Sequence, residues 1–482
     1  MHYVAIAAGF DGTLAQEGAC DARCIHALRL LSASGRRLIL VSGRELRDLL
    51  ERMPEMGVFD FVVAENGAVL YRPSTRESAI LGQAPSELLL HELHRERIGP
   101  LSVGNAVIRT PRRNRERVSR TLHRLELDIQ LVEDRAALMM VPADVSPVCG
   151  VQAALSEMGV SPRNLLAIGD YTADSGLFRF AQCSIAVAHE GTEAKTIADR
   201  TTRAQRCDGF LEVASELLSG EAGEVPQRHR ISVHLNDDDK QLMFAPGNDS
   251  LVICGTNPAA KAWLCQRIAA EMLSRTYQCC VLTDSITDLG AEIATLRANM
   301  TVVGSTLVAP RVSDAIAALD MPEISVAVDM AALSDRKRIA FAQELLRQLR
   351  NLQHGSGRPH ALVLHDRRQI HASQPELAAL ARSKGLSVVY LATEVMSLPD
   401  DLRRAATHVV TLDQASAEPA ATAASAAPSV SISSGSESAD IGQADAAEPA
   451  HTAAAAGGTL ARLSPSFDNG APSVSDRTLV TG

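Results

Sequence analysis

The first half of the chain alternates short apolar runs with segments in which apolar side chains recur at helical spacing. Apolar runs of this length that end in small or polar residues are typical of strands buried on both faces. Their alternation with helices predicts an α/β fold with a mostly parallel sheet. Strands are expected at 4–8, 38–41, 165–168 and 185–188, and helices at 22–34, 45–53, 174–180 and 193–198.

Two features interrupt this alternation. Asn66-Gly67 stands between two apolar runs and predicts a hairpin of strands 61–63 and 68–71. The segment 81–145 predicts a small βαββ insert, after which the alternation resumes. We therefore expect an α/β core formed by 1–80 and 146–219, with an α/β cap inserted at 81–145.

A second α/β domain is expected at 231–412, after a linker at 220–230. Its strands are predicted near 251–254, 279–283, 301–303, 325–328, 361–364 and 388–391, with long helices at 260–273 and 334–352. The remaining segment, 413–482, holds 19 alanines and 12 serines and almost no bulky side chains. Such a segment buries too little apolar surface to offset its ordering entropy, so we expect a disordered tail.

Composition narrows the class of protein. The net charge of -10 argues against a nucleic-acid partner, and no apolar run is long enough to cross a bilayer. The N-terminal residues also lack a secretory signal pattern, so we expect a cytoplasmic protein without a membrane partner. Nine cysteines without paired metal-ligand spacing predict reduced thiols rather than a zinc site or a disulfide framework.

Three polar clusters follow predicted strands of the first domain, where parallel sheets bind ligands. They are Gly9-Phe10-Asp11-Gly12-Thr13, Ser42-Gly43-Arg44 and Asp170-Tyr171-Thr172-Ala173-Asp174. Carboxylates and a hydroxyl that converge on one crevice are suited to hold Mg²⁺ and a phosphoryl group.

These clusters resemble the haloacid dehalogenase superfamily, specifically its Cof-type members with an α/β cap. The resemblance rests on five blocks in order: FDGTLA, LILVSGRE, AENGAVLY, NLLAIGDYTADSGLF and IAVAHEGTEAKTIADRTT. It implies a Rossmann-like core and Mg²⁺-dependent hydrolysis of phosphate esters through an aspartyl-phosphate. It also implies an acid/base role for Asp11, phosphate binding by Ser42, Gly43 and Thr13, and metal binding by Asp11, Asp170 and Asp174.

The chain departs from the family pattern at three chemical positions. Gly9 stands where the family has its nucleophilic Asp, and Cys149 stands where it has a phosphate-binding Lys. Ala173 replaces the usual Asn of the metal loop. Loss of a covalent nucleophile typically lowers the rate by about 10⁶-fold. Each retained residue also has a plainer explanation, because Asp170 or Asp174 could cap a helix and Ser42-Gly43 could form a turn.

The second domain contains the outline of a phosphate-binding loop. A predicted strand leads into Gly255-Thr256-Asn257-Pro258-Ala259-Ala260-Lys261-Ala262 and then a helix, as in G-x-x-x-x-G-K-[ST]. Only Gly255 and Lys261 match the functional positions, so ATP binding is doubtful. The stretch GRPHALVLHDRRQIHAS resembles the Walker B region of HerA-like and FtsK-like ATPases, with His365-Asp366 in place of Asp-Glu. Alternatively, Lys261 is a solvated lysine at a helix start and Asp366 belongs to a turn.

The preferred hypothesis is a phosphatase-like protein that has lost catalysis and acts by binding a small phosphorylated ligand or a protein partner. One alternative is an active Mg²⁺-dependent phosphomonoester hydrolase with a non-standard nucleophile, such as water activated by Asp11. Another is a nucleotide-dependent switch that uses Lys261.

Overall fold

The computed structural model describes residues 3–16, 18–134, 137–170, 175–188, 197–220, 225–235, 241–286, 300–365, 375–394, 398–413 and 429–434. The predicted helix at 193–198 lies mostly outside these residues. None of the helices among the described residues is long and apolar enough to cross a membrane.

An eight-stranded sheet forms the centre of the first domain, in the order β14-β13-β12-β1-β4-β5-β6-β7. Pairing is parallel from β14 to β5 and antiparallel from β5 to β7. The strands are β1 (Ala5–Gly9), β4 (Arg37–Val41), β5 (Phe61–Ala64), β6 (Val69–Arg72), β7 (Glu77–Ile80), β12 (Leu165–Gly169), β13 (Cys183–Ala188) and β14 (Arg200–Gln205). A small hairpin joins β2 (Ala15–Gln16) to β3 (Ala19–Cys20).

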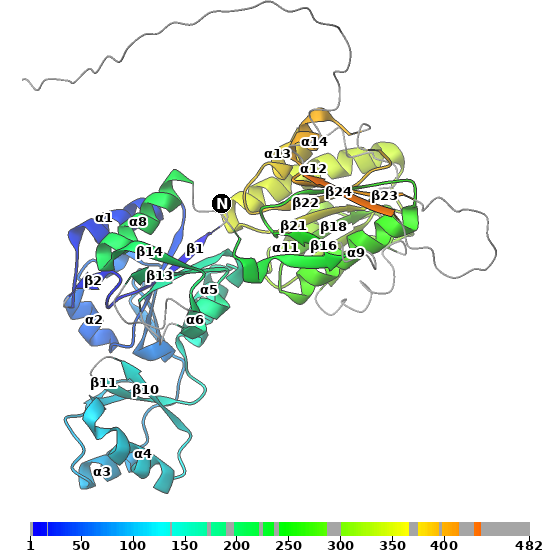
Figure 1. Cartoon of the computed structure of the whole chain (residues 1–482). Helices are drawn as coiled ribbons and strands as arrows, with labels where there is room; N and C mark the ends of the chain where they lie inside the picture. The colour runs from blue at the N-terminus through cyan, green and yellow to red at the C-terminus, as the bar shows by residue number, and fades with distance from the viewer. Residues whose placement is uncertain are drawn as a thin grey trace, which may run out of the picture. The chain divides into compact units, whose positions relative to one another are not determined.

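Helices cover both faces of this sheet, as the sequence predicts (Figure 1). They are α1 (Ala22–Ala33), α2 (Leu46–Arg52), α5 (Pro147–Met158), α6 (Ser175–Phe180) and α8 (Arg206–Ser219). Alternate side chains of β1 divide between the two layers, because successive residues of a strand point to opposite faces. Ile6 and Ala8 pack with α1 and α8, whereas Ala5 and Ala7 pack with α5 and α6.

The predicted hairpin between β5 and β6 is confirmed, but its turn is longer than Asn-Gly alone. Glu65, Asn66 and Gly67 all have positive φ and form a single 3₁₀ turn. At Gly67 a side chain is excluded for a second reason, because a Cβ would lie 1.9 Å from the Ser146 carbonyl oxygen. The hairpin therefore packs directly against the start of α5.

The insert has a four-stranded sheet of its own, in the order β10-β11-β9-β8. Its elements are α3 (Glu87–Arg95), β8 (Ser102–Val103), β9 (Ile108–Pro111), α4 (Arg115–Arg124), β10 (Ile129–Asp134) and β11 (Ala137–Pro142). The expected βαββ unit is present, but it is preceded by α3 and β8. Helix α3 escaped prediction, although its buried Leu89 and Leu93 pack with Val118 and Leu138 in the core of the insert.

The second domain is built on another parallel sheet, in the order β19-β20-β18-β21-β22-β17-β23-β24. The strands are β17 (Leu251–Cys254), β18 (Cys279–Thr283), β19 (Met300–Val303), β20 (Ser325–Asp329), β21 (Ala361–His365), β22 (Ser387–Leu391), β23 (His408–Asp413) and β24 (Ser429–Ser434). All six predicted strands are present. The chain enters this domain through the antiparallel hairpin β15 (Ile231–His234) and β16 (Gln241–Phe244), which the sequence analysis missed.

Two layers cover this second sheet. The hairpin β15–β16 and α9 (Pro258–Ser274) pack on one face. The other face is covered by α11 (Val312–Leu319), α12 (Asp335–Ser356), α13 (Pro375–Ala381) and α14 (Asp400–Ala405).

Two expectations need correction. Residues 429–434 form β24, which pairs antiparallel with β23, so the expected lack of structure after 412 is wrong for this segment. Its sequence alternates serine with Val430 and Ile432, and this period of two suits a strand. Cys24 and Cys207 form a disulfide between α1 and α8, so the expectation that every thiol is reduced is wrong for this pair. Sequence spacing gave no sign of it, because the two residues meet only through the packing of those helices.

Candidate functional site

The three polar clusters of the first domain follow strands that are neighbours in the sheet. Strand β1 lies between β12 and β4, with Gly9 paired to Val41 and Ala8 paired to Ile168. All three strands run parallel, so their carboxyl ends lie at one edge. Asp11, Ser42 and Asp170 therefore project from adjacent strand ends, as the sequence analysis expected.

Gly9 leaves a space at the end of β1. A Cβ built there would lie 3.3 Å from Thr13 Oγ1, 3.6 Å from Gly169 Cα and 3.7 Å from the Ile168 carbonyl oxygen. Only the contact with the Thr13 hydroxyl is tight. That hydroxyl is fully buried and has no hydrogen-bond partner among the described residues. Because buried polar atoms are nearly always paired, the orphaned Thr13 oxygen marks a place where a polar side chain at position 9 would be accommodated.

Asp11 is held by an arginine that the sequence analysis did not assign a role. Arg44 donates from Nε to Asp11 Oδ2 at 2.6 Å and from Nη2 to Asp11 Oδ1 at 2.8 Å. The remaining nitrogen, Nη1, donates to Asp48 Oδ2 at 2.6 Å. Hydrogen bonds with Asp11, and then with Asp48, raise the pKa of Arg44 above its usual value. Asp11 is thus paired through both oxygens with a fixed cation, and its side chain is half-buried.

Asp48 also accepts a hydrogen bond from a second arginine, which extends the Asp11–Arg44 pair into a chain of alternating charges. Arg52 Nε donates to Asp48 Oδ1 at 2.6 Å. Burial alone would raise the pKa of Asp48, but hydrogen bonds from Arg44 and Arg52 outweigh it and lower the pKa. The signal that could have identified Arg44 is its place in Ser42-Gly43-Arg44, directly after a central strand.

The Ser42 hydroxyl takes part in a local turn. Ser42 Oγ accepts a hydrogen bond from the Arg44 backbone N–H at 3.2 Å, as in the plain-turn alternative. Arg109, from the cap, donates from Nη1 to the Gly43 carbonyl oxygen at 3.4 Å. Asp170 is buried at the end of β12, and Thr172, Ala173 and Asp174 lie outside the described residues.

Cys149 lies in the first turn of α5 and supplies no positive charge. Its Sγ is 3.2 Å from Ser146 Oγ, the helix N-cap, and donates to the Asp144 carbonyl oxygen at 3.5 Å. The next residue, Gly150, is required by packing, because a Cβ there would meet Val63 Cγ1 at 2.4 Å. The backbone that would carry a lysine is therefore held tightly against the sheet, while the residue itself is a thiol.

The described residues do not complete a magnesium site. Asp11 and Asp170 are the expected metal ligands among them, and both oxygens of Asp11 already accept from Arg44. Gly9 offers no side-chain oxygen, and no group of three or more His, Cys, Asp or Glu within the described ranges could hold a metal ion. Mg²⁺ prefers several oxygen ligands free of competing cations. We therefore assign no chemical step to a metal.

Comparisons with known proteins agree with this architecture. A family model described as haloacid dehalogenase-like hydrolase matches residues 6–90 and 108–213. A phosphoglycolate phosphatase of Haloarcula marismortui is 30% identical over 218 residues, which span 42% of this chain and 93% of that protein. The chain belongs to the haloacid dehalogenase-like hydrolase family.

Further relatives have similar names and extents. A phosphoglycolate phosphatase of Archaeoglobus fulgidus is 27% identical over 213 residues, covering 43% of this chain and 94% of that protein. Among solved structures, a haloacid dehalogenase-like hydrolase from Bacteroides thetaiotaomicron is 20% identical, with a TM-score of 0.40, over 45% of this chain and 99% of that one. The family match ends at residue 213, so the haloacid dehalogenase-like domain is the N-terminal half of the chain.

Within the haloacid dehalogenase-like domain, one buried carboxylate joins the core to the cap. Glu65 is 1% exposed and lies in the turn between β5 and β6. Its Oε1 accepts from the backbone and side-chain amides of Asn105 at 3.1 and 2.9 Å. Its Oε2 accepts from the N–H groups of Ala106 at 3.0 Å and Val107 at 3.3 Å. Nothing in the local sequence marks Glu65, because its partners belong to a distant part of the chain.

In the glycine loop of the second domain, groups that would bind a phosphate already make contacts within the protein. Gly255 has φ of +131°, and a Cβ there would lie 2.0 Å from the Leu412 carbonyl oxygen. Asn257 caps α9, because its Oδ1 accepts from the N–H groups of Ala259 at 3.0 Å and Ala260 at 3.1 Å. In a phosphate-binding loop, these two amides would instead donate to the phosphate. Lys261 Nζ donates to the Ala392 carbonyl oxygen at 2.8 Å, and burial lowers the pKa of this lysine.

The second half of the expected nucleotide site follows a strand that is not the direct neighbour of β17 in the sheet. His365 ends β21, which is separated from β17 by β22, and Asp366 lies outside the described residues. His365 is 1% exposed, and its Nδ1 is 3.3 Å from Thr283 Oγ1. The buried histidine thus packs against β18.

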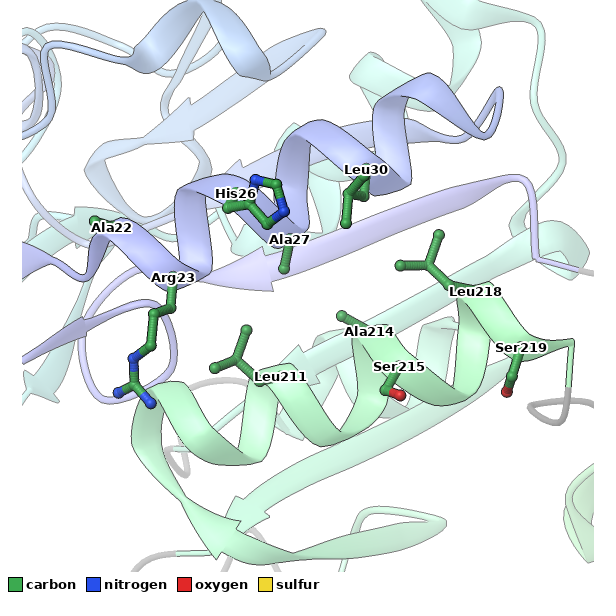
Figure 2. A pocket seen from close by; sticks show the side chains of 10 residues that line it. All are labelled: Ala22, Arg23, His26, Ala27, Leu30, Leu211, Ala214, Ser215, Leu218 and Ser219. Carbon is green, nitrogen blue, oxygen red and sulfur yellow. The ribbon is translucent and has the colours of Figure 1, made fainter. Parts of the chain in front are cut away.

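An apolar groove of about 690 Å³ lies between α1 and α8 (Figure 2). Arg23, Leu30, Leu211 and Leu218 are among the side chains that line it. None of its lining residues is a predicted site residue, so the groove is separate from the strand-end site.

Proposed function

We propose that this protein is a phosphatase-like member of its family that has lost family-type catalysis and retains binding of a small phosphorylated ligand. The observation that carries the proposal is the state of the strand-end site. Position 9 has no side chain, and the neighbouring Asp11 is bound through both oxygens to Arg44. A covalent nucleophile is absent, and the remaining carboxylate is neutralised by a fixed cation.

The same geometry supports binding. A phosphate dianion competes well for an arginine, because the guanidinium fork donates two parallel hydrogen bonds. Ser42 and the buried Thr13 hydroxyl are further donors at the same edge of the sheet. The relatives are named phosphoglycolate phosphatases, so 2-phosphoglycolate is the first ligand to test. The role that we infer is regulation through ligand occupancy.

Hydrolysis assays distinguish a protein that has lost catalysis from an active phosphatase. Wild-type protein with Mg²⁺ is incubated with 2-phosphoglycolate and p-nitrophenyl phosphate, beside the double variant Gly9→Asp with Cys149→Lys. We expect no turnover above background for wild type and measurable turnover for the double variant. Wild-type turnover that disappears in Asp11→Asn would instead establish the active hydrolase with a non-standard nucleophile.

Calorimetry tests the retained binding directly. Titration with 2-phosphoglycolate is expected to show one site whose affinity falls about tenfold or more in Arg44→Met, since one charge-assisted contact is worth roughly 1.5–3 kcal/mol. The matched control is Arg47→Met, three residues further along, in α2, whose ion pair with Glu51 is exposed. Equal affinity in Arg44→Met and wild type would remove this site from the proposal.

For the second domain we propose a P-loop-like fold, related to HerA-like and FtsK-like ATPases, that does not exchange nucleotide. The strand, glycine loop and helix support the fold, whereas the contacts of Asn257 and Lys261 oppose nucleotide binding. ATP with Mg²⁺ is expected to leave the thermal unfolding midpoint unchanged. A stabilisation by ATP that is lost in Lys261→Ala would support the nucleotide-dependent switch instead.

A further inference from the structure

A cavity of about 670 Å³ lies between the haloacid dehalogenase-like domain and the second domain. Residues 160–163 line one side and precede β12, whereas Gln278 and Ile324 line the other and precede β18 and β20. The cavity thus lies at the amino ends of these strands, opposite the edge that carries Asp11 and Ser42. Its volume is within the range of small-molecule sites, about 300–1,000 Å³.

Buried polar contacts hold the two walls of this cavity together. Asn164 Oδ1 accepts from His360 Nε2 at 3.0 Å, and Asn164 Nδ2 donates to the Gly357 carbonyl oxygen at 3.3 Å. Arg358 is 1% exposed and donates from Nη2 to the Gly159 carbonyl oxygen at 2.9 Å. The cavity is therefore enclosed by fixed rather than loosely apposed surfaces.

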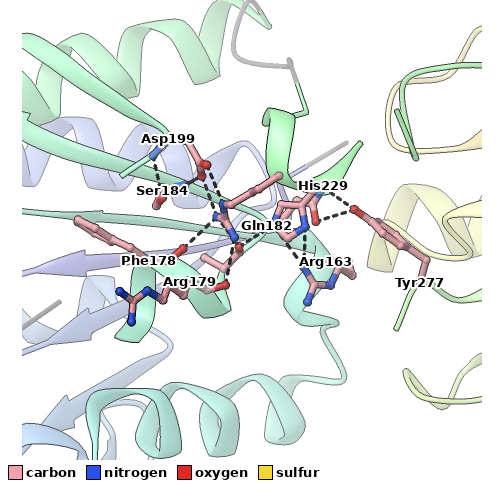
Figure 3. Close-up of polar contacts among 10 residues, drawn as sticks. Arg163, Phe178, Arg179, Gln182, Ser184, Asp199, His229 and Tyr277 are labelled. Carbon is pink, nitrogen blue, oxygen red and sulfur yellow. Dashed lines mark hydrogen bonds and ion pairs between the residues drawn. The ribbon is translucent and has the colours of Figure 1, made fainter. Parts of the chain in front are cut away.

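One guanidinium lines the cavity without a carboxylate partner among the described residues. Arg163 donates from Nε to Thr276 Oγ1 at 3.3 Å and lies 5.7 Å from the centre of the Tyr277 ring. Its Nη1 is 3.2 Å from His229 Nδ1 (Figure 3). Burial, and then the nearby positive charge of Arg228, lower the pKa of Arg163. A cation in such a setting is stabilised by an anion that enters from the cavity.

The surrounding network fixes Arg163 and, within the described ranges, pairs its charge with no carboxylate. Burial lowers the pKa of His229 to about 4, so this histidine is neutral at pH 7 and accepts the hydrogen bond. The neighbouring acid, Asp199, is already paired with Arg228 at 2.7 Å. Tyr277 exchanges hydrogen bonds with Gln182 at 3.0 and 3.1 Å, which holds the ring beside the guanidinium (Figure 3).

We propose that this cavity binds a small organic monocarboxylate, with the carboxylate on Arg163 and an apolar body against the cavity wall. The apolar wall is formed by Leu155, Val160, Phe180, Leu273 and Ile324. A planar carboxylate matches the fork of a guanidinium, and the apolar side chains favour an aromatic or aliphatic body. Glu323 lies exposed at the cavity, and its negative charge disfavours dianions such as phosphate esters. The site is therefore distinct in both place and ligand from the strand-end site.

Benzoate is the probe, followed by ligand-observed NMR and calorimetry on the full chain. We expect one saturable site, with affinity at least about tenfold weaker in Arg163→Met, and between the two in Arg163→Lys. Benzyl alcohol, which has the same ring without the charge, should bind at least about tenfold more weakly than benzoate. Arg37→Met, which removes an exposed arginine that does not line the cavity, is the matched control and should bind as wild type.

A second variant keeps the test independent of the folding of Arg163→Met. Ser156 is an exposed residue of α5 that lines the cavity, so Ser156→Trp fills the space without removing charge or disturbing a core position. It should abolish benzoate binding, whereas Arg44→Met should leave it unchanged. The proposal is overturned by unchanged binding in Arg163→Met or Ser156→Trp, by loss of binding in Arg44→Met, or by no saturable binding below about 10 mM.

Discussion

The substitution Gly9→Asp tests whether position 9 is a vacated carboxylate position or a glycine required by packing. The backbone there accepts a side chain, because within the described part of the chain the closest atom to a Cβ is the Thr13 hydroxyl at 3.3 Å. A threonine rotamer adjusts by the few tenths of an ångström needed. The steric cost should therefore be small, about 1 kcal/mol or less. The new carboxylate also gives the orphaned Thr13 hydroxyl a hydrogen-bond acceptor.

Charge repulsion is the larger effect of this substitution. Positions 9 and 11 are two residues apart on an extended segment, so the carboxylates lie roughly 6 to 7 Å from one another. At an effective dielectric constant of about 20 this repulsion is about 2.5 kcal/mol, and Arg44 offsets part of it. We expect Gly9→Asp to be about 1–2 kcal/mol less stable than Gly9→Asn, which has the same shape without the charge. The difference should shrink as the pH falls below the carboxylate pKa values.

Urea unfolding at pH 7 and at lower pH, without metal, measures this difference. Addition of Mg²⁺ should then raise the unfolding midpoint of Gly9→Asp more than that of wild type, because a second carboxylate completes part of the missing ligand set. Overpacking a protein core typically costs about 1–3 kcal/mol. If both variants lose about 4 kcal/mol or more of unfolding free energy, the loss exceeds that cost and refutes the reasoning. Gly9 would then be a packing glycine.

Three further predictions concern single side chains. Arg44→Met should lower the free energy of unfolding by about 1–3 kcal/mol, because the carboxylate of Asp11 loses both donors, while Arg47→Met changes the urea midpoint little. Thr13→Val should stabilise the protein by about 1 kcal/mol, because it removes an unsatisfied buried hydroxyl at nearly constant shape; a loss above that amount would reveal a partner for the hydroxyl. His229 has a folded pKa of about 4, below its usual 6.5, so its contribution to stability is complete above pH 6.5 and is lost as the pH falls toward 4. Up to about 3 kcal/mol should disappear over that window, and His229→Gln should flatten this part of the stability curve.

The parts of the fold that the sequence predicted are those specified by local pattern. The runs that became β1, β4, β12 and β17 are apolar on both faces and bounded by polar residues, which leaves little choice of structure. The hairpin β15–β16 was missed because its strands are short and half exposed, so its pattern is weak. Register and strand order follow from which apolar surfaces meet, and the sequence pattern alone does not encode that pairing.

In the candidate site, too, part of the arrangement could be predicted from the sequence and part could not. That Asp11, Ser42 and Asp170 share one edge followed from strand ends in a parallel sheet. The bidentate pair of Arg44 with Asp11 could not be predicted, because it depends on the side-chain geometry of two loops that are 33 residues apart. The phosphate and metal roles of these residues stay predictions until the binding experiments are done.

The carboxylate of Glu65 has a mechanical consequence for the cap. It sits at the pivot between core and insert, and its four amide donors come from a single short stretch, residues 105–107. An outward rotation of the cap would break all four hydrogen bonds to the Glu65 carboxylate together. Because this carboxylate is buried from water, the rotation would cost several kcal/mol. Cap and core should therefore tumble as one rigid body in solution. A ligand must then enter through side-chain motion rather than through opening of the whole cap.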